Sequence, residues 1–491
     1  MAPKFRCGAA DFDWLQSQWG CFLPSSLPDC PGDAAQLSYR RRAPLRAARR
    51  HVDVTARRVA VIGSGISGLS VAHGLSDCAR VTLFESADYF GGHTHTVDVT
   101  LDGMTHPVDT GFLVLNERTY PNLLRLFEQL SVAVAPSEMS FSVQVPDAGL
   151  EWSGCSVNTV FAQRTNLVRP QFWGMLTDVL RFNRLATALA RSAAAQALDM
   201  PIGEFLSHHR FGRAFRDWYF LPMIGCIWSC PVDQMLQFPV DTMIRFCHNH
   251  GLLQIANRPQ WYTVRGGART YVDKMLASVP DARLRSPVRQ VRRSRAGDPL
   301  GGVTVSTDRG TEHFDDVVLA CHSDQALAML ADPSSAESRV LGAIRYQPNR
   351  AVLHTDTALL PRRRSAWAAW NYERAAVDGR DEASVCLHYL LNRLQPLPFH
   401  TSVVVSLNPA REPAAHSVHA EFEYAHPVFD RAAILAQQHV AGLQGQRHTW
   451  YCGAWTRYGF HEDGLTSGWE VCERLRRADP AARGDAAREA A

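Results

Sequence analysis

Three glycines at the spacing GxGxxG, Gly63, Gly65 and Gly68, form the segment with the clearest chemical meaning. The segment follows the apolar run VAVI and precedes ISGLSVAHGL, in which apolar residues recur at helical spacing. In such a strand–turn–helix unit, the first glycine permits the tight turn, the second admits a pyrophosphate to the backbone, and the third lets the helix pack on the strand. The phosphates would then lie at the helix N-terminus. The pattern predicts a dinucleotide site.

Two further features extend the predicted site beyond the glycine loop. Glu85 ends the second strand-like run, VTLFE, where an acidic side chain can accept a hydrogen bond from a ribose hydroxyl. Gly91 and Gly92 follow shortly afterwards, and their backbone amides could contact a second part of an extended dinucleotide. NAD and FAD both bind to a GxGxxG loop, so these residues alone leave the choice of cofactor open.

Three separated segments resemble those of one superfamily. The run from Val59 to Thr94 resembles the opening motif of the flavin amine oxidase and phytoene desaturase superfamily, which binds FAD. A central motif of the superfamily, with which the chain re-enters the FAD-binding domain, resembles the segment TVRGGARTYVDKML followed by RLRSPVRQV. In that motif, a valine at the position of Val288 contacts the adenine side of FAD through its backbone. Residues 451–475 resemble its C-terminal motif, in which a helix N-terminus approaches the flavin and ribityl chain. The resemblance implies FAD as the cofactor. The matching positions in the C-terminal motif are Gly453, Glu462, Asp463 and Gly464.

Within this superfamily, the sequence is similar to predicted NAD/FAD-binding bacterial proteins, which resemble the flavoprotein region fused ahead of plant cyclopropane fatty acid synthases. The similarity covers about residues 58–476 and is carried by HPVDTGFLVLNERTYPNL, YFLPMIGCIWSCP, NHGLL, RPQWYTVRGG, LNRLQ, HPVFD and GFHEDG. It implies an α/β fold with a Rossmann-like FAD-binding domain, built on the GxGxxG βαβ unit. An interleaved α+β substrate domain of mixed sheet and helices completes the implied fold.

The implied FAD-binding domain is discontinuous, because its motifs lie far apart in the sequence. We expect it to comprise residues 57–115, 262–335 and 440–478. We expect the substrate domain to comprise residues 116–261 and 336–439. Residues 1–56, which mix Cys, Pro and Ser with a cluster of arginines, predict a disordered extension, and residues 479–491 predict a solvated tail.

The spacing of apolar residues predicts the elements that would position these motifs. VAVIG and VTLFE are typical of buried strands, with a helix between them. VTVST and DDVVLAC, separated by a turn at residues 308–310, predict a hairpin arm and a buried strand. Long helices are expected over residues 120–130 and 171–197.

The residues beside a flavin decide its substrate, because the hydride chemistry itself belongs to the cofactor. The resemblance predicts, for amine substrates, a lysine near the flavin and a tyrosine in the C-terminal motif. The only lysines are Lys4, in the predicted extension, and Lys274, in a predicted helix, and Phe460 takes the tyrosine position. An amine substrate is therefore not favoured.

Other positions bear on how the cofactor is held. Ala454 stands where many relatives have an acid that binds the ribityl chain, so Glu462 or Asp463 is expected to take that role. His93 follows the glycine pair, where relatives often have arginine. His93 is expected to bind the pyrophosphate, with a covalent flavin link as the alternative.

The sequence contains 20 histidines, and one is a candidate for catalysis. His461 in the C-terminal motif would lie near the flavin, where a group that titrates near neutrality can act as acid or base. His248 and His250 could flank the substrate. Their HxH spacing has no third ligand at a recognisable distance, so no metal site is predicted.

Apolar and aromatic segments suggest what the substrate is. WAAWNY (367–372), FLPMIGCIW (220–228) and NRPQW (257–261) could line a pocket for a lipid-like ligand. We therefore predict an FAD-dependent oxidoreductase that takes hydride from an apolar, lipid or fatty-acyl substrate. A desaturase or isomerase of a polyene or porphyrin-type compound is one alternative. A non-catalytic flavin- and lipid-binding accessory protein is another.

Composition narrows the class of protein. The chain has 491 residues, 46% of them hydrophobic, and a formal net charge of +3, which gives no reason to expect nucleic acid as a partner. Its 12 cysteines lack zinc-site spacing, so a reducing, cytoplasmic location is expected. No apolar run reaches the roughly 20 residues of a membrane-spanning helix. The shorter run from Tyr219 to Trp228 is either core or a peripheral membrane contact.

Overall fold

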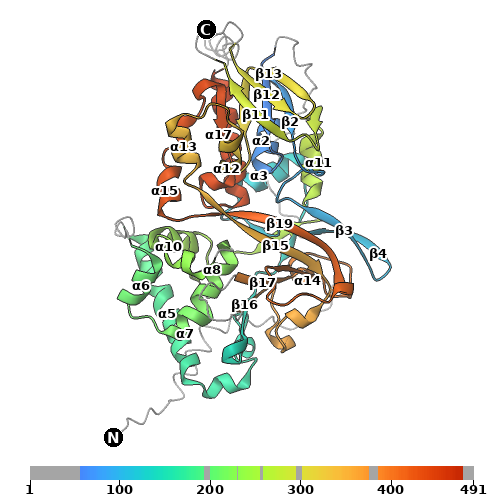
Figure 1. Ribbon diagram of the computed structural model, residues 1–491. Helices are drawn as coiled ribbons and strands as arrows, with labels where there is room; N and C mark the ends of the chain where they lie inside the picture. Colours follow the sequence, from blue (N-terminus) through green and yellow to red (C-terminus); the bar gives the residue numbers. More distant parts are fainter. Residues whose placement is uncertain are drawn as a thin grey trace.

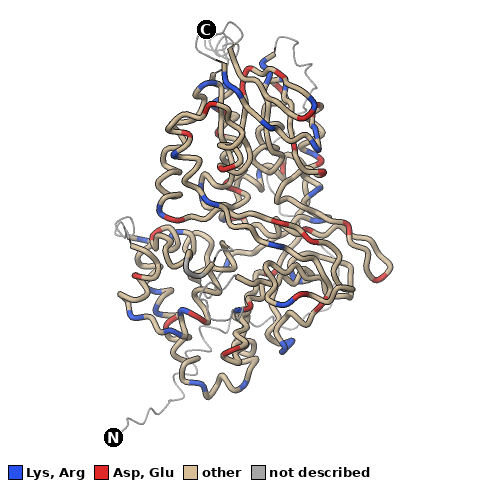
Figure 2. The backbone as a smooth tube through the Cα atoms, viewed as in Figure 1, with Lys and Arg blue, Asp and Glu red and all other residues tan. Residues whose placement is uncertain are grey.

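The computed structural model describes residues 56–192, 200–228, 231–254, 258–294, 301–374 and 385–478. The extension predicted over residues 1–56 and the tail over residues 479–491 therefore lie outside the described residues, Ala56 excepted. Figure 1 shows two parts, one above the other, with two long strands between them. Acidic and basic residues are interspersed over both parts (Figure 2).

The upper part is built on a parallel five-stranded sheet. Strand β1 pairs with β2 on one side and with β14 on the other, giving the order β10-β2-β1-β14-β20. Helix α2 (Ile66–Leu75) connects β1 to β2, as the apolar pattern predicts. The strands come from three distant stretches of sequence: β1 (Arg58–Ile62), β2 (Arg80–Phe84), β10 (Asp281–Arg283), β14 (Asp316–Leu319) and β20 (Thr449–Tyr451).

Helices and a second sheet cover the two faces of the five-stranded sheet. Helix α17 (His461–Ala478) packs on α2 so closely that a Cβ at Gly468 would lie 2.0 Å from Ser70 Oγ. Helices α3 (Pro121–Leu130) and α11 (Arg269–Leu276) lie beside them. The antiparallel sheet consists of β11 (Val288–Arg293), β12 (Val303–Thr307) and β13 (Gly310–Phe314), as the predicted hairpin requires.

The same core includes two helices that flank the predicted domain boundaries. Ala433 and Ala436 of α15 (Arg431–Gln437) and Leu341 of α13 (Ser335–Leu341) are buried in one cluster with Val317 and Leu319. Helix α12 (Ser323–Met329) and α16 (Val440–Leu443) join them. Part of the segment predicted for the substrate domain therefore packs on the five-stranded sheet.

The lower part is built on a mixed seven-stranded sheet in the order β19-β15-β18-β17-β16-β7-β8. Strand β15 pairs antiparallel with β19 along its whole length, and both run beneath the upper part in Figure 1. The strands are β7 (Phe141–Val145), β8 (Leu150–Ser153), β15 (Arg345–His354), β16 (Trp370–Arg374), β17 (Val385–Leu390), β18 (Val404–Leu407) and β19 (Val418–Val428).

Helices cover one side of this sheet. The predicted helix over residues 171–197 is α5 (Pro170–Arg191), and residues 193–199 lie outside the described residues. The others are α6 (Ile202–His208), α7 (Arg213–Phe215), α8 (Leu221–Trp228), α9 (Val232–Leu236) and α10 (Val240–Asn249). Two small sheets connect the parts. One is two-stranded and consists of β3 (Thr96–Leu101) and β4 (Met104–Asp109). The other is three-stranded and consists of β5 (Leu115–Asn116), β9 (Trp261–Val264) and β6 (Val134–Ser137).

The apolar run from Tyr219 to Trp228 lies inside the molecule. A π-helical turn over Arg216–Phe220 leads into α8, and the side chains of Phe220, Leu221 and Ile224 are buried. The run is therefore in part core and in part cavity lining, through residues such as Met223 and Ile227. In the described part of the chain, no helix combines the length and the apolar character needed to cross a membrane.

Candidate active site

A cavity of about 1780 Å³ extends from the glycine loop of the upper part into the lower part. Pockets for a single drug-sized ligand occupy roughly 300–1,000 Å³, so this one has room for more than one ligand. The predicted site residues that line this cavity are Gly63, Gly65, Glu85, Gly91, Gly92, His93, Gly453 and His461. Gly68, Val288, Glu462, Asp463 and Gly464 are not among the residues that line it.

The three glycines of the loop have three different surroundings. Gly63 has a φ of +101°, and a Cβ there would lie 2.7 Å from the Ala320 carbonyl oxygen. A Cβ at Gly68 would lie 1.8 Å from the Gly63 carbonyl oxygen, so the helix packs directly on the turn. A Cβ at Gly65, the N-cap of α2, would have no other atom within 4 Å. The open backbone at Gly65 is the feature that a bound pyrophosphate needs.

Glu85 and the glycine pair complete this end of the cavity. Glu85 Oε2 accepts hydrogen bonds from Ser64 N at 2.9 Å and Ser64 Oγ at 2.6 Å, which fixes the loop before any ligand binds. Gly91 N donates to Ser64 O at 3.1 Å, and a Cβ at Gly92 would lie 3.2 Å from Gly65 Cα. The two glycine segments therefore form one cradle of backbone groups.

His93 has an unsatisfied hydrogen-bonding atom in this cradle. Its Nε2 atom is buried and has no hydrogen-bond partner among the described residues. A buried polar atom without a partner costs about 1–3 kcal/mol, so such atoms usually serve a ligand. Burial, with smaller contributions from His322 and His95, lowers the pKa of His93 to about 4. His93 is therefore neutral at pH 7 in the ligand-free protein, and its Nε2 is available to hydrogen-bond a pyrophosphate.

His461 lines the cavity, but it does not titrate as predicted. Its Nε2 forms a hydrogen bond with the Tyr271 hydroxyl, and its ring stacks on Phe112 with centroids 4.0 Å apart. Burial, with a smaller contribution from His93, lowers its pKa to about 3. This value lies below the neutral range in which an acid or base was predicted to titrate. His461 is held rigidly beside the cradle instead.

The acidic pair of the C-terminal motif has structural partners. Glu462 Oε1 and Oε2 accept hydrogen bonds from Asn122 N and Leu123 N, each at 2.9 Å, and so cap helix α3. Asp463 Oδ2 accepts a hydrogen bond from Phe460 N at 3.0 Å. Burial raises the pKa of Asp463 to about 6. These side chains position the start of α17 and are not among the residues that line the cavity.

Gly464 and Val288 also have other surroundings. A Cβ at Gly464 would lie 2.8 Å from Ile66 Cγ2, so this glycine allows α17 to pack on α2. Val288 lies on β11, opposite Thr307 of β12, and does not line the cavity. Gly453 does line the cavity, and its N–H donates to Ser467 Oγ at 2.9 Å. Ala454 lies beside it in the lining.

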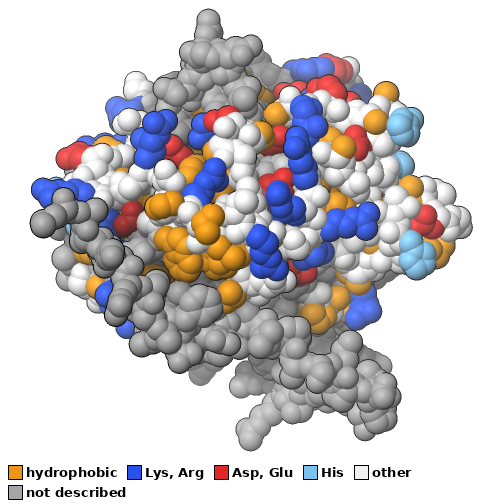
Figure 3. Space-filling view, turned by 90° about the horizontal axis from the view of Figure 1, so that it is seen from below, with side chains coloured by type: hydrophobic (Ala, Val, Ile, Leu, Met, Phe, Trp, Pro, Cys, Tyr) orange, Lys and Arg blue, Asp and Glu red, His pale blue; other side chains and the backbone are white. Residues whose placement is uncertain are grey.

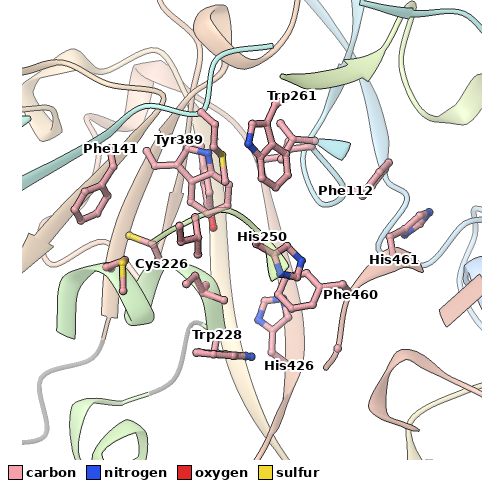
Figure 4. A pocket seen from close by; sticks show the side chains of 18 of the residues that line it. Phe112, Phe141, Cys226, Trp228, His250, Trp261, Tyr389, His426, Phe460 and His461 are labelled. Carbon is pink, nitrogen blue, oxygen red and sulfur yellow. The ribbon is translucent and has the colours of Figure 1, made fainter. Parts of the chain in front are cut away.

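The other end of the cavity is an apolar arm between α5, α8 and the seven-stranded sheet. All three predicted segments contribute to it, through residues such as Ile227, Trp261 and Trp370; Asn257 lies outside the described residues. Phe460 stacks on Phe246 with centroids 4.8 Å apart where the arm meets the cradle. Figure 4 shows Phe460, His250, Trp228 and Trp261 arranged around one space. The remaining arm residues include Trp152, Phe161, Trp173, Leu176, Val179, Leu180, Tyr219 and Met223.

No lysine lines this cavity in the described part of the chain. Lys274 Nζ donates to the carbonyl oxygens of Leu130 and Ser131, each at 2.8 Å, at the C-terminal end of α3. His250 lines the arm, whereas His248 does not. Burial lowers the pKa of His250 to about 4. The lysine that the resemblance associates with amine substrates is therefore missing from the lining.

Some lining residues gave no signal in the sequence. His322 and His426 lie 6.3 Å and 5.4 Å from the His93 ring, measured between centroids. Asn183 Oδ1, Trp228 Nε1 and Trp370 Nε1 are buried in the lining without a hydrogen-bond partner among the described residues. Strand β19 brings His426 to the cavity and helix α5 brings Asn183, so no local pattern marks these two residues. Trp228 and Trp370 belong to segments that the sequence did predict as lining.

Comparison with known proteins agrees with this arrangement. The family described as flavin containing amine oxidoreductase matches residues 66–387. A fatty acid isomerase from P. acnes has a similar structure, with a TM-score of 0.59 and 15% identity over 87% of this chain and 99% of that chain. Cyclohexylamine oxidase from Brevibacterium oxydans IH-35A gives a TM-score of 0.61 and 14% identity, over 86% and 100%. Putrescine oxidase bound to putrescine gives 0.59 and 15%, over 85% and 98%. No curated protein sequence matches the chain.

Proposed function

The chain belongs to the flavin containing amine oxidoreductase family, and from this we propose that it is an FAD-dependent oxidoreductase whose substrate is a fatty-acyl chain. The observation that carries the proposal is the continuity of the cavity. The cradle of Gly65, Gly91 and Gly92 passes directly into an arm lined by aliphatic and aromatic side chains. A flexible apolar chain fits such an arm, because burial of its methylene groups supplies the binding energy.

The residues present fit FAD at one end and an apolar chain at the other. The open backbone at Gly65, the glycine pair and the unpartnered His93 Nε2 would hold the dinucleotide. When bound, FAD supplies hydride acceptance. The side chains of Phe460 and Phe246 would hold the reacting part of the acyl chain against it and exclude water. The buried His461 stays neutral and keeps its ring in place through Phe112 and Tyr271.

Double-bond isomerisation of an acyl chain is the second candidate. The fatty acid isomerase from P. acnes shares the fold. The histidines at the cradle, His93 and His461, both have a pKa lowered to about 4 or below, so neither provides a proton carrier near pH 7. A reaction that removes hydride and returns it to another carbon of the same chain would suit this lining. Product analysis separates the two reactions, because oxidation leaves an additional double bond and isomerisation does not.

The test is anaerobic reduction of the FAD-loaded protein. We expect loss of the flavin's visible absorbance after addition of detergent-dispersed oleic or stearic acid, and little change after addition of putrescine or cyclohexylamine. Isomerisation would leave the flavin oxidised at the end but yield a shifted double bond by mass spectrometry. Rapid reduction by either amine would contradict the proposal. Stoichiometric flavin without reduction or product from any acyl chain would indicate the accessory flavin- and lipid-binding protein.

The proposal includes a cytoplasmic protein with peripheral membrane contact. Buried cysteines such as Cys226, Cys247 and Cys452 are present as thiols, which fits a reducing compartment. A fatty-acyl substrate is concentrated in membranes, so an enzyme that uses it has reason to approach their surface. Removal of the protein from a membrane fraction by salt or carbonate, with the protein found in neither periplasm nor medium, is the expected result of cell fractionation.

A further inference from the structure

The apolar arm opens at the surface beside α4 (Val157–Val160) and the 3₁₀ turn η3 (Arg164–Val168). Val157, Leu167 and Trp173 line the cavity, yet the side chains of Val157 and Leu167 are 41% and 42% exposed. The next residue, Val168, is 83% exposed. Five large hydrophobic side chains are exposed among the described residues, and three of them are Val157, Leu167 and Val168. We call these three the mouth patch.

The backbone holds the mouth patch in place. Ser156 caps α4 through a capping box with Thr159. Trp173 Nε1 donates to Leu167 O at 2.9 Å, which ties η3 to the first turn of α5. The aliphatic side chains are therefore presented by a fixed surface at the end of the arm. Grouped apolar exposure of this kind marks an interaction site.

The surroundings of the mouth patch are basic. The 3₁₀ turn η7 (Arg364–Ala366) packs against α4 and β8. Arg164, Arg362 and Arg364 are exposed in the segments that contain η3 and η7. Arg363 pairs with Glu151, and Arg169 is half-buried and donates to Ala148 O. The bordering Glu151 is neutralised, because it accepts hydrogen bonds from Arg363 NH1 and from the backbone N–H of Arg362. Figure 3 views the molecule from this side and shows hydrophobic side chains gathered beside Lys and Arg side chains.

We propose that the mouth patch docks on a bilayer containing anionic phospholipid, and that the acyl substrate passes from the bilayer directly into the arm. Aliphatic side chains of the patch would enter the interface between headgroups and acyl chains, and the arginines would pair with lipid phosphates. A second copy of this chain is a poor occupant, because the arginines of two facing patches would repel each other. The substrate part of this inference rests on the proposed function; the docking part does not.

Vesicle co-sedimentation of the full-length, FAD-loaded protein tests the docking. We expect binding to vesicles of phosphatidylcholine with phosphatidylglycerol, weaker binding to phosphatidylcholine alone, and weakening with added salt. V168E should lower the affinity about tenfold, because a charge replaces an inserted methyl pair. R362E should lower it about fivefold or more. The matched control is L435E, since Leu435 is 49% exposed on α15, in the upper part.

Activity separates docking from chemistry. Val168 does not line the cavity, so V168E should keep its flavin and react normally with detergent-dispersed acyl chains while losing activity on vesicle-borne ones. Equal vesicle binding by the wild type and V168E, or no binding by the wild type, would overturn the proposal. A dimer in gel filtration that V168E converts to a monomer would also overturn it, in favour of self-association. Absence of any reaction with acyl chains, together with V168E-sensitive vesicle binding, would refute the proposed function and support the docking.

Discussion

Two groups of histidines lie inside this molecule, and they differ in exposure and in their hydrogen bonds. The sheet histidines, His354 of β15 and His388 of β17, are fully buried between strands of the lower sheet. The cavity histidines line the space around the cradle and are His93, His250, His322, His426 and His461. Burial lowers the pKa of all five to about 4 or 3, and that of His354 to about 4. A lowered pKa therefore does not distinguish them, whereas exposure does, because the sheet histidines are fully buried and the cavity histidines are half-buried.

The sheet histidines form a complete network. Asp356 N donates to His354 Nδ1 at 3.1 Å, so the neutral ring carries its proton on Nε2 and donates to Ser406 Oγ at 2.6 Å. Ser406 then donates to His388 Nδ1 at 2.6 Å, and His388 Nε2 donates to Glu373 Oε2 at 3.0 Å. Every ring nitrogen has a partner, which is the expected state of a buried polar network that only holds a fold together.

The comparison teaches that a lowered pKa does not mark the ligand site, and that an unsatisfied nitrogen is informative where it also lines the cavity. His93 Nε2 lacks a partner among the described residues and lies in the cradle. Glu373, Cys386 and His388 have the residue types of a metal site and lie close together. In the network, His388 Nε2 lies 3.0 Å from Glu373 Oε2 and 3.4 Å from Cys386 Sγ, so the three side chains are joined by hydrogen bonds.

The largest expected effect comes from removing a sheet histidine. H388A leaves the buried Glu373 carboxylate without its donor and opens a cavity, so we expect the free energy of unfolding to fall by about 3–5 kcal/mol. Urea denaturation followed by circular dichroism measures it. H416A is the control, because His416 is exposed and its removal should change stability by less than about 0.5 kcal/mol. A loss below about 1 kcal/mol in H388A would show that the network does not support the sheet.

His93 should behave in the opposite way. H93A removes an atom that already lacks a partner, so stability of the FAD-free protein should change little. The dissociation constant for FAD should rise about tenfold, the value of one hydrogen bond of about 1–1.5 kcal/mol. H93Q should recover part of the affinity, because its amide can still donate. Flavin fluorescence titration measures these constants.

A neighbour of His93 provides the matched control for this measurement. His95 does not line the cavity, and its Nδ1 is 3.0 Å from the Tyr424 hydroxyl. H95A should therefore cost stability and leave the FAD dissociation constant unchanged. If H93A and H95A weaken FAD binding equally, the assignment of His93 to the cofactor is refuted.

The cofactor end was predictable from sequence because its signals are local. Gly63, Gly65 and Gly68 lie within six residues of one another, and each spacing is dictated by the turn itself. The helix over residues 66–75 and the strands on either side of it were predicted from apolar spacing for the same reason. The resemblance also gave the family correctly, which matches residues 66–387.

The rest of the site depends on tertiary packing. Glu462 caps α3 because α17 packs against α3. The two helices are more than 300 residues apart in the sequence. The pKa of His461 depends on its burial against Phe112 and Tyr271, which come from other segments. His426 reaches the cradle on β19, from the far edge of the lower sheet. No periodicity or motif in the sequence records such contacts.

The smallest effect is expected in the pH dependence of stability. His93 has a folded pKa of about 4, below its unfolded value of 6.5, so between these values the unfolded chain binds more protons and acid destabilises the fold. Burial raises the pKa of Asp109 and Asp463 to about 6, so acid stabilises the fold through these two groups. The five cavity histidines outnumber them, so the net effect of acid is destabilising. H93Q removes one histidine from this balance. Between pH 7.5 and 5.5 it should lose about 1 kcal/mol less stability than the wild type, as measured by urea denaturation at each pH. Identical losses would mean that the pKa of His93 is the same in the folded and the unfolded protein, so that burial does not keep its ring neutral below pH 6.5.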